Sequence, residues 1–261
     1  MRKLKTKEDL TEWALNAKRL WLFLDYDGTL DEFAPTPYDI RPNPEIIRVL
    51  EKLTSKPSVR VSVISGRSLE YVRQLVPISG IYLAGSYGIE VFTLEQETIH
   101  RLKFEAIRPL LESIKPQWAQ LIRGRRGFFL EDKGWTLAIH ARFADDQESV
   151  DVLQDAREAN GLHTLLEDFR ILGGHKFLEI APRLANKGET VLHFLQTYPF
   201  EDARLIYIGD DDKDEEAFSV IQAHGGIAIK VVQPSQISQP TEADLCFATP
   251  QETLEWLDML A

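Results

Sequence analysis

The sequence predicts an α/β protein with a doubly wound parallel sheet that is interrupted by an α+β insertion. Its first and last thirds alternate short apolar runs with stretches of helical spacing, a pattern typical of parallel strands joined by right-handed crossover helices. Its middle third shows apolar runs paired around turn residues, which favours antiparallel hairpins. The 261 residues exceed the usual domain of about 100 to 150 residues, so two unequal modules fit the length.

The first third supplies three strands of the predicted parallel sheet. Leu20–Leu24 is a continuous apolar run, as expected of a strand buried on both faces, and it ends at Asp25. Asn43–Lys56 shows helical spacing, with Pro44 tolerated in the first turn. The other expected elements are strands at Val59–Ile64 and Ile81–Ala84 and a helix at Ser68–Val76.

The middle third has the features of an inserted module. Strands in antiparallel pairs, with helices set apart from them, are typical of α+β architecture. We place the edges of the insertion near Lys103 and Gly174, which leaves a core of residues 1–102 and 175–261 around an insertion of residues 103–174. The expected elements are strands at Phe128–Glu131, Thr136–Arg142, His163–Phe169 and Lys176–Ile180 and a helix from Asp145 to about Asn160.

The last third returns to the alternation of strands and helices and completes the parallel sheet. The expected elements are helices at Lys187–Gln196, Asp214–Ala223 and Pro250–Leu260 and strands at Leu205–Ile208, Ile227–Val231 and Ala243–Phe247. The only cysteine, Cys246, lies in the last of these strands, so no disulfide can form within one chain. We expect it to be a small buried apolar side chain.

Composition and charge narrow the class of ligand. With 44% hydrophobic and 27% charged residues, the chain has the composition of a globular protein with a real core. The formal net charge of −11 opposes broad binding to nucleic acids or anionic membranes, so a phosphate-bearing ligand would need local cations or a metal. Met1–Lys7 is charged, and no run approaches the roughly 18 apolar residues needed to span a bilayer. We therefore expect a soluble cytoplasmic protein.

Two carboxylates directly follow the first buried strand, in the segment Asp25-Tyr26-Asp27-Gly28-Thr29-Leu30. Open α/β sheets bind their ligands at this carboxyl edge. Asp25 and Asp27 can face one pocket if the chain turns, and Gly28 supplies the backbone freedom for the turn. The alternative is a polar turn in which Thr29 caps a helix.

A second acidic cluster, Asp210 to Glu216, holds six acidic residues in seven positions after another apolar strand. These carboxylates would repel one another without a counter-ion. A hard cation with oxygen ligands would offset the repulsion between the carboxylates, and Mg²⁺ suits a site that also holds phosphate. The alternative is an acidic first turn of the helix that begins at Asp214, where the helix dipole favours carboxylates.

Two further segments carry groups that can grip phosphate oxygens. Ser65-Gly66-Arg67 ends the second strand with a hydroxyl, a flexible backbone N–H and a cation. Lys187 opens the helix after the insertion, where a cation is unfavourable for the helix dipole unless an anionic partner is near. The alternatives are a turn with a helix cap for the first segment and a solvated lysine for the second.

Taken in order, the four segments resemble the haloacid dehalogenase superfamily of phosphatases, and within it the chain resembles the trehalose-6-phosphate phosphatase family along nearly its whole length. The resemblance implies a Rossmann-like core with a mobile α/β cap inserted after the third strand. The stretches that carry it are Leu24 to Leu30, Ile64 to Arg67, Glu131 to Gly134 with His140 and Arg142, Phe177 to Ile180 with Pro182, and Ile208 to Asp211 with Ala217-Phe218.

The resemblance also implies roles for the core residues in a Mg²⁺-dependent phosphatase. Asp25 would be the nucleophile that forms an acyl phosphate, and Asp27 the general acid and base. The Asp25 and Asp210 carboxylates and the Asp27 carbonyl would bind Mg²⁺, and Asp211 and Asp214 would support the ion or orient Lys187. Ser65, Gly66 and Lys187 would bind the phosphoryl group with the help of Arg67.

Substrate identity depends on the insertion. From the resemblance, Glu131, Lys133 and Glu179 are candidates for contacts with sugar hydroxyls, and the alternative for all three is ordinary exposed charge. The partner would be a small sugar phosphate bound by a monomer.

One departure from the family pattern bears on the sugar, because Ser86-Tyr87-Gly88 stands where the family usually has a His-Gly pair. The alternatives are therefore a phosphatase for glucosylglycerol phosphate, mannosylglycerate phosphate or sucrose phosphate, a phosphate-transferring mutase or transferase, and a non-catalytic sugar-phosphate-binding module.

Overall fold

The computed structural model describes residues 6–33, 39–159, 167–174, 176–232 and 240–261, and the chain divides into two compact units. The first unit combines residues 1–99 with 186–261, and the second is formed by residues 100–185. Among the described residues, none of the helices combines the length and the apolar character needed to cross a bilayer.

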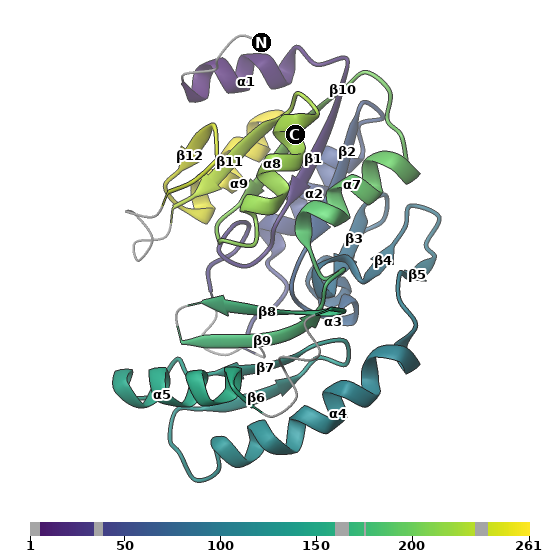
Figure 1. Ribbon diagram of the computed structural model, residues 1–261. Helices are drawn as coiled ribbons and strands as arrows, with labels where there is room; N and C mark the ends of the chain where they lie inside the picture. The colour runs from purple at the N-terminus through teal and green to yellow at the C-terminus, as the bar shows by residue number, and fades with distance from the viewer. Residues whose placement is uncertain (1–5, 34–38, 160–166, 175, 233–239) are drawn as a thin grey trace. The chain divides into compact units, whose positions relative to one another are not determined.

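The first unit contains an eight-stranded sheet in the order β12-β11-β10-β1-β2-β3-β4-β5 (Figure 1). The strands from β12 to β3 pair in parallel, and β4 pairs antiparallel to β3. The strands are β1 (Arg19–Leu24), β2 (Val59–Ile64), β3 (Tyr82–Gly85), β4 (Glu90–Phe92), β5 (Thr98–His100), β10 (Ala203–Gly209), β11 (Ile227–Val231) and β12 (Leu245–Phe247). This is the predicted doubly wound sheet.

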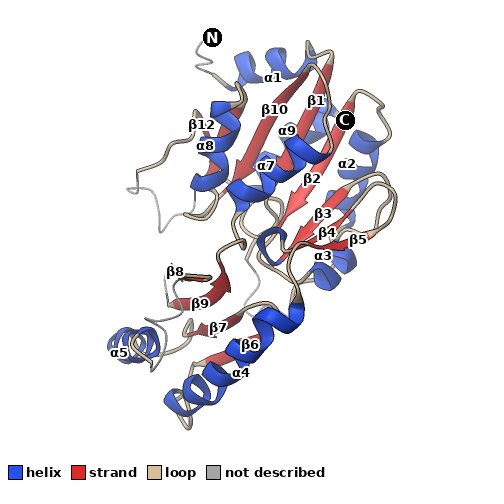
Figure 2. Ribbon diagram, turned by 45° about the vertical axis from the view of Figure 1, so that its right-hand side comes forward, coloured by secondary structure: helices blue, strands red, loops and turns tan. Residues whose placement is uncertain are grey.

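Helices cover both faces of this sheet (Figure 2). One face is covered by α1, α2, α3 and α9, and the other by α7 and α8. The strand β1 is a continuous apolar run because helices cover both of its faces: Leu22 points to the first group of helices and Phe23 to the second. The helices are α1 (Lys7–Leu15), α2 (Pro44–Thr54), α3 (Leu69–Leu75), α7 (Lys187–Thr197), α8 (Glu215–Ala223) and α9 (Pro250–Leu260).

Local capping fixes where the helices next to the predicted site begin. The Asn43 side chain accepts a hydrogen bond from the backbone N–H of Glu45, and Pro44 occupies the first turn of α2. Asn186 caps α7 in the same way through the N–H of Glu189, so α7 begins at Lys187. By fixing the start of α7, the Asn186 side chain places Lys187 at the carboxyl edge of the sheet.

The second unit is a four-stranded antiparallel sheet in the order β6-β7-β9-β8, with α4 and α5 along one face (Figures 1 and 2). The side chains of Leu137, Ile139, Leu178 and Ile180 share one face of this sheet and are fully buried, and Ala138 and Glu179 on the opposite face are fully buried as well. The elements are α4 (Phe104–Leu121), β6 (Phe129–Asp132), β7 (Leu137–His140), α5 (Asp146–Arg157), β8 (Phe169–Gly174) and β9 (Phe177–Pro182).

The second edge of the insertion lies further along the chain than expected. We placed it near Gly174, but β9 pairs antiparallel with β7 and β8, so the second unit continues to residue 185. The strand expected at Lys176–Ile180 corresponds to β9 and belongs to the second unit, as its place among the expected strands of the insertion implies, so it lies beyond the boundary placed at Gly174. Residues 163–166 of the strand expected at His163–Phe169, and the expected helix end at Asn160, lie outside the described residues.

Cys246 is exposed, which corrects the expectation of a buried thiol. It lies on β12, the three-residue edge strand of the sheet, where the neighbouring Phe247 points inward and is buried. Because side chains alternate along a strand, the cysteine points outward.

Candidate active site

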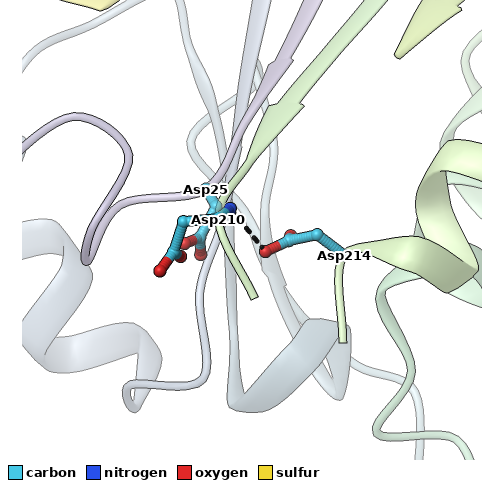
Figure 3. Close-up of side chains that lie close together, drawn as sticks. All are labelled: Asp25, Asp210 and Asp214. Carbon is cyan, nitrogen blue, oxygen red and sulfur yellow. Dashed lines mark hydrogen bonds between the residues drawn. The ribbon is translucent and has the colours of Figure 1, made fainter. Parts of the chain in front are cut away.

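The carboxyl ends of β1 and β10 bring two aspartates together. The two strands are parallel neighbours, with Leu24 opposite Ile208, and the N–H of Asp25 donates to the Ile208 carbonyl at 2.9 Å. Asp25, Asp210 and Asp214 each offer a carboxylate oxygen, and these atoms all lie within 4.8 Å of one another. Figure 3 shows Asp25 and Asp210 side by side, with Asp214 approaching from the start of α8. All three are almost completely buried.

Asp210 carries the unsatisfied charge of this cluster. Both of its carboxylate oxygens are buried and have no hydrogen-bond partner among the described residues. Burial, followed by repulsion from Asp211 and Asp25, raises the pKa of Asp210 well above its ordinary value. A bound divalent cation would supply the missing partner for these oxygens and offset the repulsion, so the residues present fit a metal site.

Lys187 partly balances the same cluster. Its Nζ lies 2.8 Å from Asp25 Oδ1, 2.7 Å from Asp214 Oδ1 and 3.9 Å from Asp211 Oδ1. Burial alone would lower the pKa of Lys187, but the neighbouring carboxylates raise it well above its ordinary value, so the ammonium stays charged. Burial raises the pKa of Asp25, and Lys187 opposes that shift.

Asp214 is held by four donors, which fits a supporting role. Its Oδ1 accepts hydrogen bonds from Lys187 Nζ at 2.7 Å and from the Tyr207 hydroxyl at 2.6 Å. Its Oδ2 accepts the backbone N–H of Asp210 at 3.1 Å (Figure 3) and the backbone N–H of Asp211, also at 3.1 Å. Tyr207 was not among the predicted site residues, because a tyrosine inside an apolar strand gives no sign that its hydroxyl reaches a carboxylate.

Three other acidic residues of the cluster pair with lysines: Asp211 and Asp212 with Lys213, and Glu215 with Lys230. Lys213 Nζ lies 2.8 Å from Asp211 Oδ2 and 3.0 Å from Asp212 Oδ1. Although burial raises the pKa of Asp211, Lys187 and Lys213 more than compensate, and the net pKa lies well below its usual range. The need for a cation is therefore greatest at Asp210, whose oxygens have no hydrogen-bond partner among the described residues, although burial also raises the pKa of Asp214, to about 8.

The loop after β1 has to be built around glycine. Gly28 has φ +79°, and a Cβ placed there would lie 2.4 Å from Asp210 Oδ2. Only glycine allows this close approach and this backbone conformation together. The Thr29 hydroxyl donates to Asp25 Oδ2 at 3.4 Å, so this side chain faces the nucleophile candidate.

Asp27 is paired with Arg67. The Arg67 guanidinium donates from Nε to Asp27 Oδ2 at 2.7 Å and from Nη2 to Asp27 Oδ1 at 2.6 Å, a bidentate arrangement. The backbone N–H of Arg67 donates to the Ser65 hydroxyl at 3.1 Å, and Ser65 is completely buried. The loop that was expected to grip phosphate thus also holds the candidate acid and base.

The predicted substrate residues of the second unit lie on one face of its sheet. Lys133 Nζ lies 3.0 Å from Glu179 Oε1, and Glu179, which is completely buried, also accepts the Thr136 hydroxyl. Glu131 Oε2 lies 2.8 Å from His140 Nε2. These groups are ordered, partly or fully buried pairs, which differs from the alternative of ordinary exposed charge.

Comparison with known proteins gives a consistent result. The model of a family described as trehalose-phosphatase matches residues 23–251. A probable trehalose-phosphate phosphatase of Sinorhizobium fredii is 32% identical, covering 88% of this chain and 82% of that protein. The trehalose-6-phosphate phosphatase of Escherichia coli is 31% identical, covering 97% and 91%. Mycobacterial relatives are longer, and the chain spans 62% of their length.

The fold has a solved counterpart. The C-terminal domain of the Candida albicans trehalose-6-phosphate phosphatase has a TM-score of 0.85 at 21% identity, covering 99% of this chain and 98% of that one. A doubly wound sheet with buried carboxylates and a lysine gathered at its carboxyl edge fits the haloacid dehalogenase class, and the family match and the named relatives show that the protein is a phosphoric monoester hydrolase. Within that class, the chain belongs to the trehalose-phosphatase family.

Proposed function

We propose that the protein hydrolyses trehalose 6-phosphate to trehalose and inorganic phosphate, with Mg²⁺ and through an aspartyl-phosphate intermediate on Asp25. The observation that carries the proposal is the Asp25 carboxylate, which is buried at the end of β1, held by Lys187 at 2.8 Å and placed beside the unpartnered oxygens of Asp210. Trehalose is proposed as the sugar because the relatives are named trehalose-phosphate phosphatases.

In the first step of the proposed reaction, a carboxylate oxygen of Asp25 attacks phosphorus, and the bond between phosphorus and the sugar oxygen breaks. Asp27 gives its proton to the departing oxygen. In the second step Asp27 takes a proton from water, and that water splits the acyl phosphate and restores Asp25. Splitting one displacement into two lowers each barrier.

The other core residues stabilise the charge that moves during these steps. Ser65, Gly66 and Lys187 bind the phosphoryl oxygens, and Arg67 belongs to the same loop. Asp25 and Asp210, with the backbone carbonyl of Asp27 and with Asp211 nearby, would hold Mg²⁺, which when bound supplies positive charge beside the phosphoryl group. Asp214 keeps Lys187 in place through their 2.7 Å contact.

The second unit is proposed to act as the cap that recognises the sugar. Glu131, Lys133 and Glu179 lie on one sheet face and are held by fixed partners, so their polar atoms have defined positions. Hydrogen-bonding groups with fixed positions discriminate between sugars better than mobile ones. A monomer that acts on a small molecule in the cytoplasm completes the proposal, and light scattering tests the monomeric state.

The proposal is tested by phosphate release with Mg²⁺ from trehalose 6-phosphate, glucose 6-phosphate, sucrose 6-phosphate and glucosylglycerol phosphate. We expect selective release from trehalose 6-phosphate and none with Asp25→Asn, because the nucleophile is lost. Release from another member of the panel would keep the mechanism and change the substrate. Binding without release would favour a non-catalytic module, and transfer of phosphate to a sugar would favour a mutase or transferase.

A further inference from the structure

A strained turn follows β3. Ser86, Tyr87 and Gly88 form one turn of 3₁₀ helix with φ angles of 51°, 57° and 95°. The left-handed region is unfavourable for residues with a side chain, and here two such residues adopt it in succession. Strain of this kind persists only where surrounding contacts impose it, and it is concentrated at functional sites.

On one side, the turn is tied to the loop Ser65–Arg67. The backbone N–H of Tyr87 donates to the Ser65 carbonyl at 2.9 Å, and the N–H of Ser86 donates to the Arg67 carbonyl at 2.6 Å. The Tyr87 ring lies over Gly66, because a Cβ at Gly66 would lie 2.6 Å from Tyr87 Cζ and 2.7 Å from its hydroxyl oxygen. The side chain is only 5% exposed.

On the other side, the turn is tied to α7. The Thr190 hydroxyl donates to the Tyr87 carbonyl at 2.8 Å. Gly88 packs so closely on the same side chain that a Cβ there would lie 1.8 Å from Thr190 Oγ1. Thr190 lies one helical turn beyond Lys187, so the turn joins the two segments that carry Ser65 and Lys187.

We propose that Tyr87 is a positioning residue for phosphoryl binding: the turn 86–88 is a bracket that fixes the loop Ser65–Arg67 relative to α7, and the Tyr87 ring pins Gly66 beneath it. The inference rests on the proposed function, in which Ser65, Gly66 and Lys187 bind the phosphoryl group. Small errors in the position of such groups reduce rates strongly, which gives a reason to hold them on a strained but rigid turn.

The test compares Tyr87→Ala with Tyr87→Phe on trehalose 6-phosphate and on p-nitrophenyl phosphate, together with inhibition by inorganic phosphate. Because all three ligands present the same phosphoryl group, Tyr87→Ala should lower kcat/KM for both substrates and weaken phosphate inhibition, each by about 10-fold or more. Tyr87→Phe keeps the ring and should change little. A loss confined to trehalose 6-phosphate would make Tyr87 a sugar contact and overturn the proposal, as would unchanged phosphate inhibition in Tyr87→Ala.

A matched control separates positioning from simple loss of stability. Tyr82 is a second buried tyrosine, on β3 and packed against Phe194, so Tyr82→Ala should lower the thermal midpoint but leave phosphate inhibition unchanged. If Tyr87→Ala does not fold, Thr190→Val removes the hydroxyl that ties the turn to α7 and should weaken phosphate inhibition in the same direction. Unchanged inhibition in Thr190→Val would then count against the bracket.

A double-mutant cycle tests the contact with Gly66. In the wild type, a methyl group on Gly66 collides with the Tyr87 ring, so Gly66→Ala should weaken phosphate binding. In the Tyr87→Ala background that space is open, and the same substitution should cost little. Additive losses would contradict the contact. Phosphate binding measured by calorimetry keeps this test valid even if no sugar phosphate is turned over, so failure of the proposed function and failure of the bracket remain distinguishable.

Discussion

Asp210 is the residue on which the proposed metal requirement of the site depends. Asp211 is paired with Lys213, and Asp214 accepts four hydrogen bonds although burial raises its pKa to about 8. The two oxygens of Asp210, by contrast, have no hydrogen-bond partner among the described residues. A buried carboxylate in this position disfavours the folded state unless a cation is bound, because burial and like charges both oppose ionisation.

We expect Asp210→Asn to stabilise the metal-free protein and to remove its stabilisation by Mg²⁺. The substitution removes the negative charge whose burial and repulsion by Asp211 and Asp25 oppose folding, so the stability of the metal-free protein should rise. Thermal unfolding in EDTA and in excess Mg²⁺ measures both effects. Asp212→Asn is the matched control, because Asp212 is 65% exposed and should change neither quantity. Equal Mg²⁺ stabilisation of wild type and Asp210→Asn would place the metal elsewhere.

Arg67 offers a second test at this scale, because its guanidinium holds Asp27 in a bidentate pair. If the main role of Arg67 is to orient Asp27 as the proton donor, Arg67→Gln should slow attack on trehalose 6-phosphate by about 100-fold, a rate effect within the range of general acid catalysis. The initial burst of p-nitrophenol from p-nitrophenyl phosphate should change little, because that leaving group needs no proton.

Two observations check the assignment of Arg67. Arg67→Lys should lie between wild type and Arg67→Gln, since lysine lacks the planar fork. Equal losses on the two substrates would instead place Arg67 on the phosphoryl oxygens.

At the residue scale, the sequence predicts which groups meet but not how they pair. Asp25, Asp210 and Lys187 could be placed together because each stands at the end of a strand or the start of a helix on one edge of the sheet. The pairing of Asp27 with Arg67 and the contact of Tyr207 with Asp214 depend on side-chain orientation. No spacing in the sequence records that orientation.

At the scale of elements, α4 shows where sequence patterns fail. This helix is absent from the elements expected from the sequence, and it contains Pro109 and Pro116, which are unfavourable inside a helix. Tertiary contacts override that signal: Trp118 is fully buried, and its Nε1 donates to the Ala156 carbonyl of α5 at 3.0 Å. The parallel core strands were predictable, by contrast, because burial on both faces leaves continuous apolar runs.

The charge cluster around Asp132 fastens α4 to the sheet of the second unit. Arg108 Nη1 and Nη2 lie 2.7 Å and 2.6 Å from the two Asp132 oxygens, and Lys115 Nζ lies 2.8 Å from Oδ2. Hydrogen bonds from Arg108 and Lys115 hold the pKa of Asp132 well below its usual range, although burial opposes them. The ionised carboxylate therefore stabilises the folded state.

We expect Asp132→Asn to lower the free energy of unfolding by about 1 kcal/mol at pH 7, the size typical of partly exposed ion pairs. Because the folded pKa is depressed, this stabilisation is complete above the unfolded pKa of about 3.9 and is lost as the pH falls through the folded value. Urea unfolding at a series of pH values should show the difference between variant and wild type shrinking below pH 4. Asp155→Asn, on the exposed side of α5, is the control; a pH-independent difference would contradict the assignment.

At the scale of the whole molecule, the proposed reaction divides between the two units. The first unit, residues 1–99 with 186–261, contains every group proposed to act on the phosphoryl group, and the second, residues 100–185, contains the polar sheet face proposed to recognise the sugar. The net charge of −11 gives this division a physical reason. A phosphorylated ligand is repelled by the molecule as a whole, so the proposed mechanism has attraction supplied locally by Lys187 and a bound cation. In the same proposal the cap selects among sugars by hydrogen bonding.

This division predicts that a cap substitution separates the two substrates. Glu131→Ala should raise KM for trehalose 6-phosphate by about 10-fold or more, the equivalent of about 1.4 kcal/mol for one charged hydrogen bond, and leave hydrolysis of p-nitrophenyl phosphate nearly unchanged. The reason is that p-nitrophenyl phosphate has no sugar hydroxyl for Glu131 to bind. Glu105→Ala, an exposed glutamate in the first turn of α4, is the matched control and should affect neither substrate. Equal losses on both substrates in Glu131→Ala would mean that the second unit acts on the chemistry itself, and the division between phosphoryl-binding core and sugar-binding cap would have to be abandoned.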